Sequence, residues 1–264
     1  VGSEMCIRDR PFTEAEAVRR AIYLAGQTDT PLYIAHMTCR EAIAELQKAK
    51  GTGQRVSGET CTHYLTTTKE VLDNPDFNEA AKFVCSPALR DREDCEALWQ
   101  ALSDGLLTAV SSDHCGIDVA ELKQAGRNDF TQIPNGSPGA GDRLHMVWTE
   151  GVCTGKLTRQ KFVDVIATQP AKINGIYPRK GTLAVGSDAD VVIFDPNYEG
   201  TVHLADNPNG VDYNLYEGRR QSGRVETVLL RGQVVVENAK FVGRYGQGKF
   251  IPANMYASGY ENRN

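Results

Sequence analysis

Short β-type segments alternate with amphipathic helical patterns in the first half of the chain, and this alternation constrains the fold more than any other feature. The β-type segments are PLYIAH (31–36), RVSGET (55–60) and LLTAVSSD (106–113), and helical spacing of apolar residues separates them. Strands that alternate with helices of about 10–15 residues are typical of a parallel sheet with right-handed crossovers. We therefore expect an α/β fold.

The character of the sequence changes after Gly181. The segments DADVVIFD (188–195) and VETVLLRGQVVVENAKFVG (225–243) predict antiparallel strands, and the second is expected to be a hairpin that turns at Arg231–Gly232. The loop-rich stretch 116–142 precedes two further predicted helices, 142–155 and 158–168. We divide the chain into an α/β body (11–180), a β portion (181–245) and a tail (246–264).

The first ten residues, VGSEMCIRDR, show neither helical nor strand periodicity. They resemble a translated sequencing-adapter peptide, and we interpret residues 1–10 as a non-native leader.

The composition of the chain excludes some classes of partner. A net charge of −5 without clustered Lys and Arg argues against nucleic acid as a partner. The sequence has no apolar run of the about 20 residues that span a bilayer and no signal peptide, so we expect a cytoplasmic protein without a membrane partner.

Cysteine usage gives no support for a disulfide framework or a zinc finger. The seven cysteines are odd in number, scattered, and never spaced as CxxC. Two other residues are better candidates for a metal site, because His36 and Asp113 each end a predicted strand. In parallel barrels the carboxyl ends of the strands converge on the active-site face. Taken alone, each residue has an ordinary alternative, since His36 could be a structural hydrogen-bonding residue and Asp113 a helix cap.

Seven separated motifs in one order favour the metal-site interpretation. They are YIAHMTC, GETCTHYL, CSPALRDRED, SSDHCG, DFTQIPNG, QPAKINGIYPRKGTLAVGSDADVVIFDP and YNLYEG. From about Pro11 onward, the chain resembles the C-terminal part of hydantoinases and dihydropyrimidinases, which belong to the amidohydrolase superfamily. The resemblance implies the C-terminal part of a TIM-like (β/α)8 barrel, followed by strands of a small β-sandwich domain.

The resemblance also implies a centre of two zinc ions. Such a centre uses an HxH pair, a carboxylated Lys, two later His residues and an Asp. In this sequence His36 matches the second later His and Asp113 matches the Asp, whereas no HxH occurs. The carboxylated Lys and the other ligands are therefore expected in a missing N-terminal part. We expect the chain to be a fragment that is inactive alone.

The resemblance further implies the opening of hydantoin or 5,6-dihydropyrimidine rings to N-carbamoyl amino acids. Asp113 would act first as general base and then as general acid. Ser86 and Asn135 would bind the small cyclic ureide or imide substrate, although both also suit ordinary turns. Full-length members of the family imply a homotetramer or dimer.

Two alternatives stay open. One is a non-catalytic scaffold homologue of the collapsin response mediator type, and the other is an allantoinase-like or dihydroorotase-like hydrolase. His63 and His114 lie near the predicted site, but we expect them to support it through hydrogen bonds rather than as metal ligands. We expect Arg179 and Lys180 to make surface or interdomain contacts rather than an anion site.

Overall fold

The computed structural model describes residues 10–254, and its N-terminal half alternates helices with parallel strands. The elements in order are α2 (Pro11–Gln27), β1 (Leu32–Ile34), α3 (Arg40–Gly51), β2 (Val56–Cys61), α4 (Thr62–Thr66), η1 (Lys69–Asp73), α5 (Phe77–Ala81), α6 (Arg92–Ser103) and β3 (Ala109–Ser111). The strands pair in the order β1-β2-β3, and both pairs are parallel. The predicted α/β fold is confirmed.

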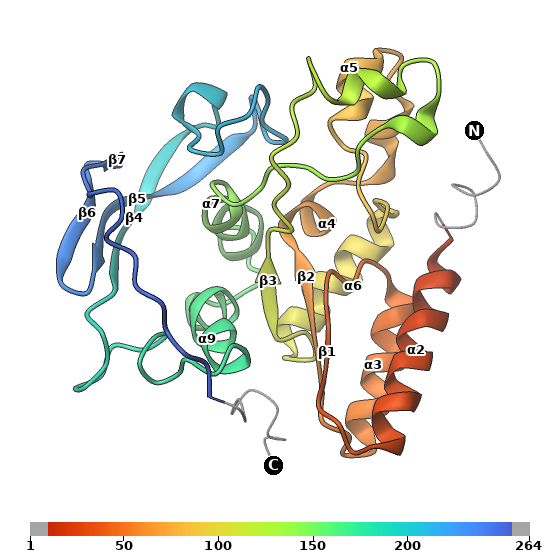
Figure 1. Cartoon of the computed structure of the whole chain (residues 1–264), viewed down its shortest axis with the longest axis horizontal. Helices are drawn as coiled ribbons and strands as arrows, with labels where there is room; N and C mark the ends of the chain where they lie inside the picture. The colour runs from red at the N-terminus through yellow and green to blue at the C-terminus, as the bar shows by residue number, and fades with distance from the viewer. Residues whose placement is uncertain (1–9, 255–264) are drawn as a thin grey trace.

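The helices of this half bury one apolar stripe each, as their residue spacing predicts. Val18 and Ile22 of α2 are buried, Leu46 of α3 is fully buried, and so are Leu98 and Leu102 of α6. Helices α2 and α3 lie side by side beyond β1, whereas α7 and α9 lie beyond β3 (Figure 1). The main hydrophobic core therefore fills the space between the sheet and these helices.

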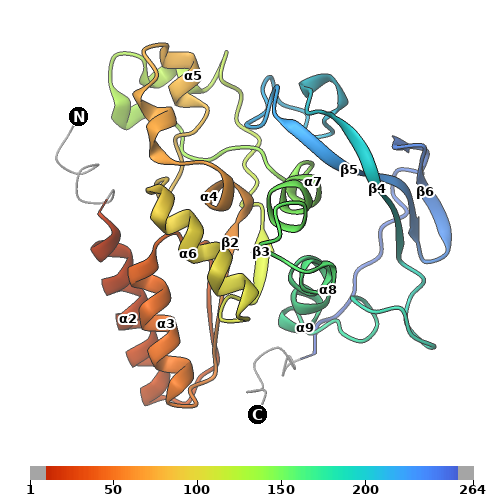
Figure 2. The same cartoon turned by 180° about the vertical axis from the view of Figure 1, so that it is seen from behind.

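A second group of helices separates the two sheets. Helix α7 (Arg143–Val147) continues into the π-helical turn η4 (Trp148–Val152), and α8 (Arg159–Val163) continues through η5 (Asp164–Thr168) into α9 (Gln169–Ile173). Both predicted helices are confirmed, and the second runs on to Ile173. Figure 2 shows these helices between the parallel sheet and the C-terminal strands. The long loop before α7 contains two short turns, η2 (Lys123–Gly126) and η3 (Phe130–Gln132).

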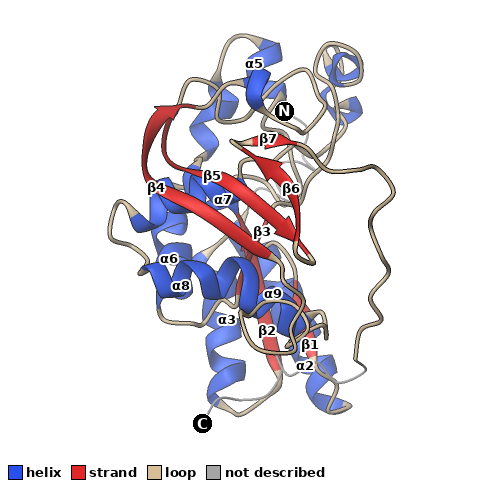
Figure 3. Ribbon diagram, turned by 90° about the vertical axis from the view of Figure 1, so that its left-hand side faces the viewer, coloured by secondary structure: helices blue, strands red, loops and turns tan. Residues whose placement is uncertain are grey.

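The C-terminal strands form one antiparallel sheet in the order β4-β5-β6-β7 (Figure 3). They are β4 (Val191–Thr201), β5 (Arg220–Leu230), β6 (Gln233–Glu237) and β7 (Lys240–Phe241), with the turn η6 (Leu204–Asp206) between β4 and β5. Arg231 and Gly232 have φ angles of 50° and 78°, as a tight hairpin turn requires, so the predicted turn is confirmed.

Aromatic contacts join this sheet to the body. The ring of Trp148 lies edge-on to Phe162 and to Phe194, with centroids 5.3 and 4.8 Å away. Trp148 thus connects a helix of the body with strand β4, and such pairs add about 0.5–1.5 kcal/mol each beyond the area they bury.

The ends of the chain lie largely outside the described residues. Of the predicted leader only Arg10 is described, and of the predicted tail only residues 246–254. The described end of the tail returns to the body, where the Asn254 amide donates to the Gly175 carbonyl at 2.9 Å. Within residues 10–254, each helix is too short or too polar to cross a membrane.

Candidate active site

His36 and Asp113 lie at the same end of the parallel sheet. His36 follows the last residue of β1 by two positions, and Asp113 follows the last residue of β3 by two positions. Both have left-handed backbones, with φ of 38° and 44°. Non-glycine residues adopt this conformation infrequently, and it is enriched at functional sites. The left-handed turns also explain why both strands end earlier than the sequence predicts.

The segment after His36 is held against strand β2. The Met37 amide donates to the Glu59 carbonyl at 2.8 Å, and the Thr60 hydroxyl donates to the Met37 carbonyl at 2.8 Å. These bonds occupy both backbone polar groups of the residue next to His36. The position of the His36 backbone is therefore set by β2, the central strand of the sheet.

The segment after Asp113 is held by the loop that contains Asn135. The Cys115 amide donates to the Ser137 carbonyl at 3.0 Å, and Nδ1 of His114 accepts from the Gly139 amide at 3.3 Å. The expected supporting hydrogen bond of His114 is thus present. Asp113 and Asn135 are both exposed, as residues that meet a substrate must be.

Ser86 lies in a loop that contacts the Asn135 loop directly. The Gly136 amide donates to the Val84 carbonyl at 2.9 Å, which joins the two loops one residue from Asn135 and two residues from Ser86. The Tyr64 hydroxyl donates to the Pro87 carbonyl at 2.7 Å and fixes the other side of Ser86. The hydrogen bonds therefore connect the segments that carry Ser86, Asn135 and Asp113, and His36 follows the strand on the other side of β2.

His63 lies in helix α4, two residues after the last residue of the central strand β2. The residue is 4% exposed, and its ring lies tilted against that of Tyr64, with centroids 4.1 Å apart. Burial, with a smaller contribution from His36, lowers the pKa of His63 to about 4. The expected hydrogen bond is missing from Nε2, which has no partner among the described residues. A buried neutral imidazole nitrogen thus lies unsatisfied beside the candidate site.

The described residues supply too few donors for a complete metal site. No three or more His, Cys, Asp or Glu side chains within residues 10–254 are grouped so that they could hold a metal ion. His36 and Asp113 are an imidazole and a carboxylate, which are donor types that zinc accepts, but a zinc ion takes about four ligands. The donor set therefore fits zinc in kind and needs further ligands in number.

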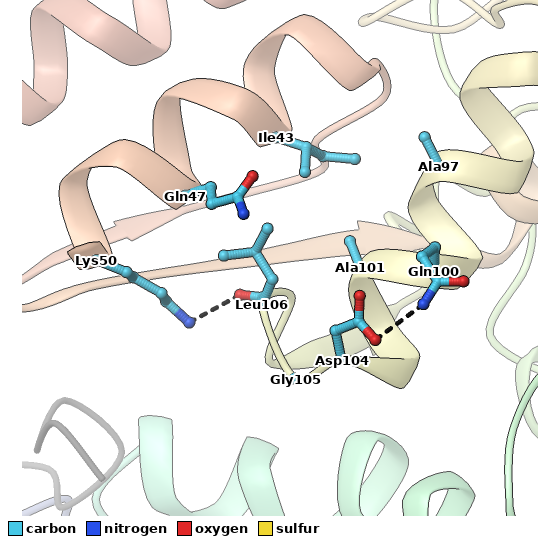
Figure 4. A pocket seen from close by; sticks show the side chains of 9 residues that line it. All are labelled: Ile43, Gln47, Lys50, Ala97, Gln100, Ala101, Asp104, Gly105 and Leu106. Atoms are coloured by element: carbon cyan, nitrogen blue, oxygen red, sulfur yellow. Dashed lines mark hydrogen bonds between the residues drawn. The ribbon is translucent and has the colours of Figure 1, made fainter. Parts of the chain in front are cut away.

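A surface groove lies at the other end of the sheet, between α3 and α6 (Figure 4). Lys50 Nζ donates to the Leu106 carbonyl at 2.7 Å across it, and Gln100 donates to Asp104 at 2.8 Å. Leu106 precedes β3, so the groove is at the amino end of the strands. In barrels this end contributes to stability rather than to catalysis.

The basic residues after α9 are paired with acids. Lys180 contacts Asp188 at 3.0 Å and also pairs with Asp190, and Arg179 contacts Asp188 at 3.0 Å. The expectation of surface or interdomain contacts is consistent with these pairs, and they leave little positive charge for an anion.

Comparison with known proteins identifies the family. The sequence profile of the amidohydrolase family matches residues 20–235. The D-hydantoinase of Ralstonia pickettii is 47% identical over 246 residues, which are 93% of this chain and 53% of the relative. The dihydropyrimidinase of Arabidopsis thaliana is 39% identical over 241 residues, which are 91% of this chain and 45% of the relative.

The fold agrees with these sequences. The crystal structure of dihydropyrimidinase from Brevibacillus agri superimposes with a TM-score of 0.92 at 44% identity, covering 94% of this chain and 54% of that one. The chain spans about half the length of the curated relatives it matches. The family match over residues 20–235 and the common fold lead to one conclusion: this chain belongs to the amidohydrolase family.

Proposed function

We propose that the chain contributes half of a zinc-dependent hydrolase that opens cyclic amides. The observation that carries the proposal is the placement of His36 and Asp113, which follow the two outer strands of a three-stranded parallel sheet, at the same end, through left-handed turns. These two residues would bind the metal, and Asp113 would also move a proton. The related D-hydantoinases and dihydropyrimidinase support hydantoin or 5,6-dihydropyrimidine rings as substrates.

The remaining metal ligands belong to polypeptide outside residues 10–254. By resemblance to the family they include a carboxylated Lys and further His residues. Bound zinc would make a water molecule acidic enough to act as hydroxide near neutral pH. In architecture, β1-β2-β3 would be part of a (β/α)8 barrel within residues 11–180, and β4 to β7 part of a β-sandwich within residues 181–245. Both assignments rest on the parallel and antiparallel pairing of these strands.

Asp113 is suited to carry a proton from the attacking water to the departing ring nitrogen. Its carboxylate is exposed at the strand end, where it can accept the proton of the attacking water. The same proton then passes to the ring nitrogen as the carbon–nitrogen bond breaks. The products of one water and one cyclic ureide are a carboxylate and a ureido group on the same molecule, an N-carbamoyl amino acid.

Ser86 and Asn135 would orient the ring. Cyclic ureides present alternating carbonyl and N–H groups along one edge, and recognition of that edge needs donors and acceptors at fixed spacing. The bond between Gly136 and Val84 holds the two loops at such a fixed spacing. Recognition by both loops would select the amide edge and leave the ring substituent free.

A non-catalytic scaffold of the same fold is the weaker alternative. A scaffold has no chemical requirement for His36 and Asp113, yet both positions carry residues that suit a metal. An allantoinase-like or dihydroorotase-like activity would use the same metal chemistry. Metal content therefore cannot distinguish these hydrolases, whereas turnover of a panel of cyclic substrates can.

The proposal is tested with a chimera in which this chain replaces the matched segment of the Ralstonia pickettii D-hydantoinase. We expect the zinc-loaded chimera to open hydantoin or dihydrouracil, and the 264-residue chain alone to open neither. The parent D-hydantoinase controls for the assay, and circular dichroism and zinc content control for folding. A folded, zinc-loaded chimera that hydrolyses none of the cyclic amides would contradict the proposal.

A further inference from the structure

Lys123 is a buried cation in the turn η2, inside the long loop between β3 and α7. Its side chain is fully buried, with 0% exposure. Nζ donates to three backbone carbonyls, those of Ala81 at 2.8 Å, Gly136 at 2.8 Å and Val84 at 3.4 Å. An ammonium group has three hydrogens to donate, and here they all meet carbonyls.

Two of the three carbonyls, those of Val84 and Gly136, belong to the loops that carry Ser86 and Asn135, and the third, that of Ala81, ends helix α5 just before the Ser86 loop. Val84 precedes Ser86 by two residues, and Gly136 follows Asn135 directly. The Gly136 amide also donates to the Val84 carbonyl, so that Lys123 and this backbone bond join the same pair of residues. Lys123 therefore closes a cross-link between the loops.

A second bond extends this cross-link. The Ser137 hydroxyl donates to the Lys82 carbonyl at 2.7 Å, so the bonds to residues 81, 82 and 84 hold the end of α5 and the start of the Ser86 loop. On its other side Ser137 accepts from the Cys115 amide, two residues beyond Asp113. Lys123 thus lies beneath a continuous set of bonds from the Ser86 loop to the Asp113 loop.

A buried charge at this position is unfavourable in itself. Burial lowers the pKa of Lys123 to about 8, and no ion pair found within residues 10–254 includes it. An apolar side chain of similar length would fill the same volume without that desolvation cost. It could not, however, hold the carbonyls of the α5 end and of both loops around one point.

We propose that Lys123 is a positioning residue that sets the spacing between the Ser86 and Asn135 loops. This role rests on the proposed function, since it matters to activity only if both loops bind the cyclic ureide. The loops would then present their polar groups to opposite sides of one amide edge, at a spacing fixed by a cation that never touches the substrate.

The first test measures amide hydrogen exchange in the 264-residue chain, with Lys123→Met. Met keeps the length and removes the three donors. We expect the Gly136 amide and the 81–87 segment to exchange about tenfold faster, as loss of one or more hydrogen bonds implies. Exchange in α6 should be unchanged. Lys48→Met, at an exposed lysine of α3, is the matched control.

The second test measures kinetics of the chimera on hydantoin. Lys123→Met should raise KM about tenfold with a smaller change in kcat, because misplaced loops weaken substrate binding more than chemistry. If Lys123→Met does not fold, Lys123→Gln is used in both tests. Gln keeps two donors on a shorter chain and should give a smaller change of the same kind.

Faster exchange confined to the two loops together with a raised KM supports the proposal. Unchanged exchange at Gly136, or loosened loops with an unchanged KM in an active chimera, overturns it. An inactive wild-type chimera contradicts the proposed function instead, and exchange in the chain alone then decides whether Lys123 joins the loops.

Discussion

Arg90 and Glu14 form a buried ion pair beside the candidate site, with Nη2 and Oε2 3.1 Å apart. Their side chains are 3% and 10% exposed. Between them lies Thr38, whose amide donates to Glu14 Oε1 at 2.7 Å and whose hydroxyl donates to the other carboxylate oxygen. Arg90 Nε donates to that hydroxyl at 2.9 Å. The pair thus fixes a residue two positions from His36.

Glu14→Gln should destabilise the chain strongly. The substitution leaves the Arg90 guanidinium buried without this carboxylate, and breaking a buried ion pair from one side costs about 3–5 kcal/mol. Urea denaturation measures the free energy of unfolding. The double variant Glu14→Gln with Arg90→Met should lose less than the two single losses combined, because it removes both charges of this pair.

Glu16→Gln is the control on the same helix. Glu16 pairs with Arg20 at 3.1 Å, but both side chains are more than half exposed. Exposed pairs contribute about 0–1 kcal/mol, so this variant should unfold close to the wild type. Equal effects of the two substitutions would show that the Glu14 carboxylate has no special role.

The fold was largely predictable because its signals are local. Alternating strand and helix patterns lie within windows of about ten residues, and the turn at Arg231–Gly232 is a dipeptide signal. Strand ends were harder to predict. PLYIAH has a continuous β-type composition, yet β1 stops at Ile34, because His36 takes a left-handed backbone that hydrogen bonds from the neighbouring strand hold in place.

The candidate site was only partly predictable, because some of its contacts join residues that are far apart in the sequence. His36 and Asp113 follow strand ends, and motif order made them candidates for the site, as it did Ser86 and Asn135. Lys123 carried no local signal, because its acceptors lie 42, 39 and 13 residues away. A single lysine in a polar loop is ordinarily solvated. Only the folded chain shows that the ammonium is enclosed by carbonyls.

Alkaline pH should destabilise the chain through its buried thiols. Burial raises the pKa of Cys39 to about 12 and the pKa values of Cys85 and Cys95 to about 11, from 9.0. The unfolded chain therefore loses these protons near pH 9, whereas the folded chain keeps them up to about pH 11. The folded state binds more protons in this window, so the free energy of unfolding falls as pH rises from 9 to 11.

Cys95→Ala isolates one of these thiols. A shift of two pKa units is worth at most about 3 kcal/mol, and the variant should lose less stability than the wild type between pH 9 and 11. Urea denaturation under reducing conditions gives the values. The lowered pKa of Lys123 makes the free energy of unfolding rise with pH over part of this range. Because the wild type and Cys95→Ala both contain Lys123, this contribution cancels in their comparison. Cys153→Ala, at an exposed thiol, should leave the pH dependence unchanged.

Zinc should bind the 264-residue chain weakly and through His36. Complete structural zinc sites with about four ligands contribute about 10–16 kcal/mol. Two ligands for one zinc ion would supply about half of that free energy, which corresponds to a Kd of about 1–100 µM. Competition with a chromophoric chelator measures this affinity. His36→Ala should weaken it further, whereas His203→Ala, at an exposed histidine paired with Glu217, should not. Tight stoichiometric zinc in the chain alone would contradict a two-donor site.

Asp113→Asn should abolish most of the turnover of the chimera while preserving its fold. Asn keeps the size and one oxygen donor of Asp but cannot carry a proton, and loss of a general base costs about 10²–10⁴-fold in kcat. Asp104→Asn is the matched control, because Asp104 lies in the groove at the other end of the sheet, where Gln100 donates to it.

Zinc content separates the two roles of Asp113. If the variant retains zinc but not turnover, the proton-transfer role accounts for the loss. If it loses zinc as well, the ligand role dominates, and added zinc should restore part of kcat by mass action. Turnover within about tenfold of the wild type would show that another group moves the proton. Nε2 of His63, which has no hydrogen-bond partner within residues 10–254 and lies in α4 just after the intervening strand, would then be the next atom to test by His63→Gln.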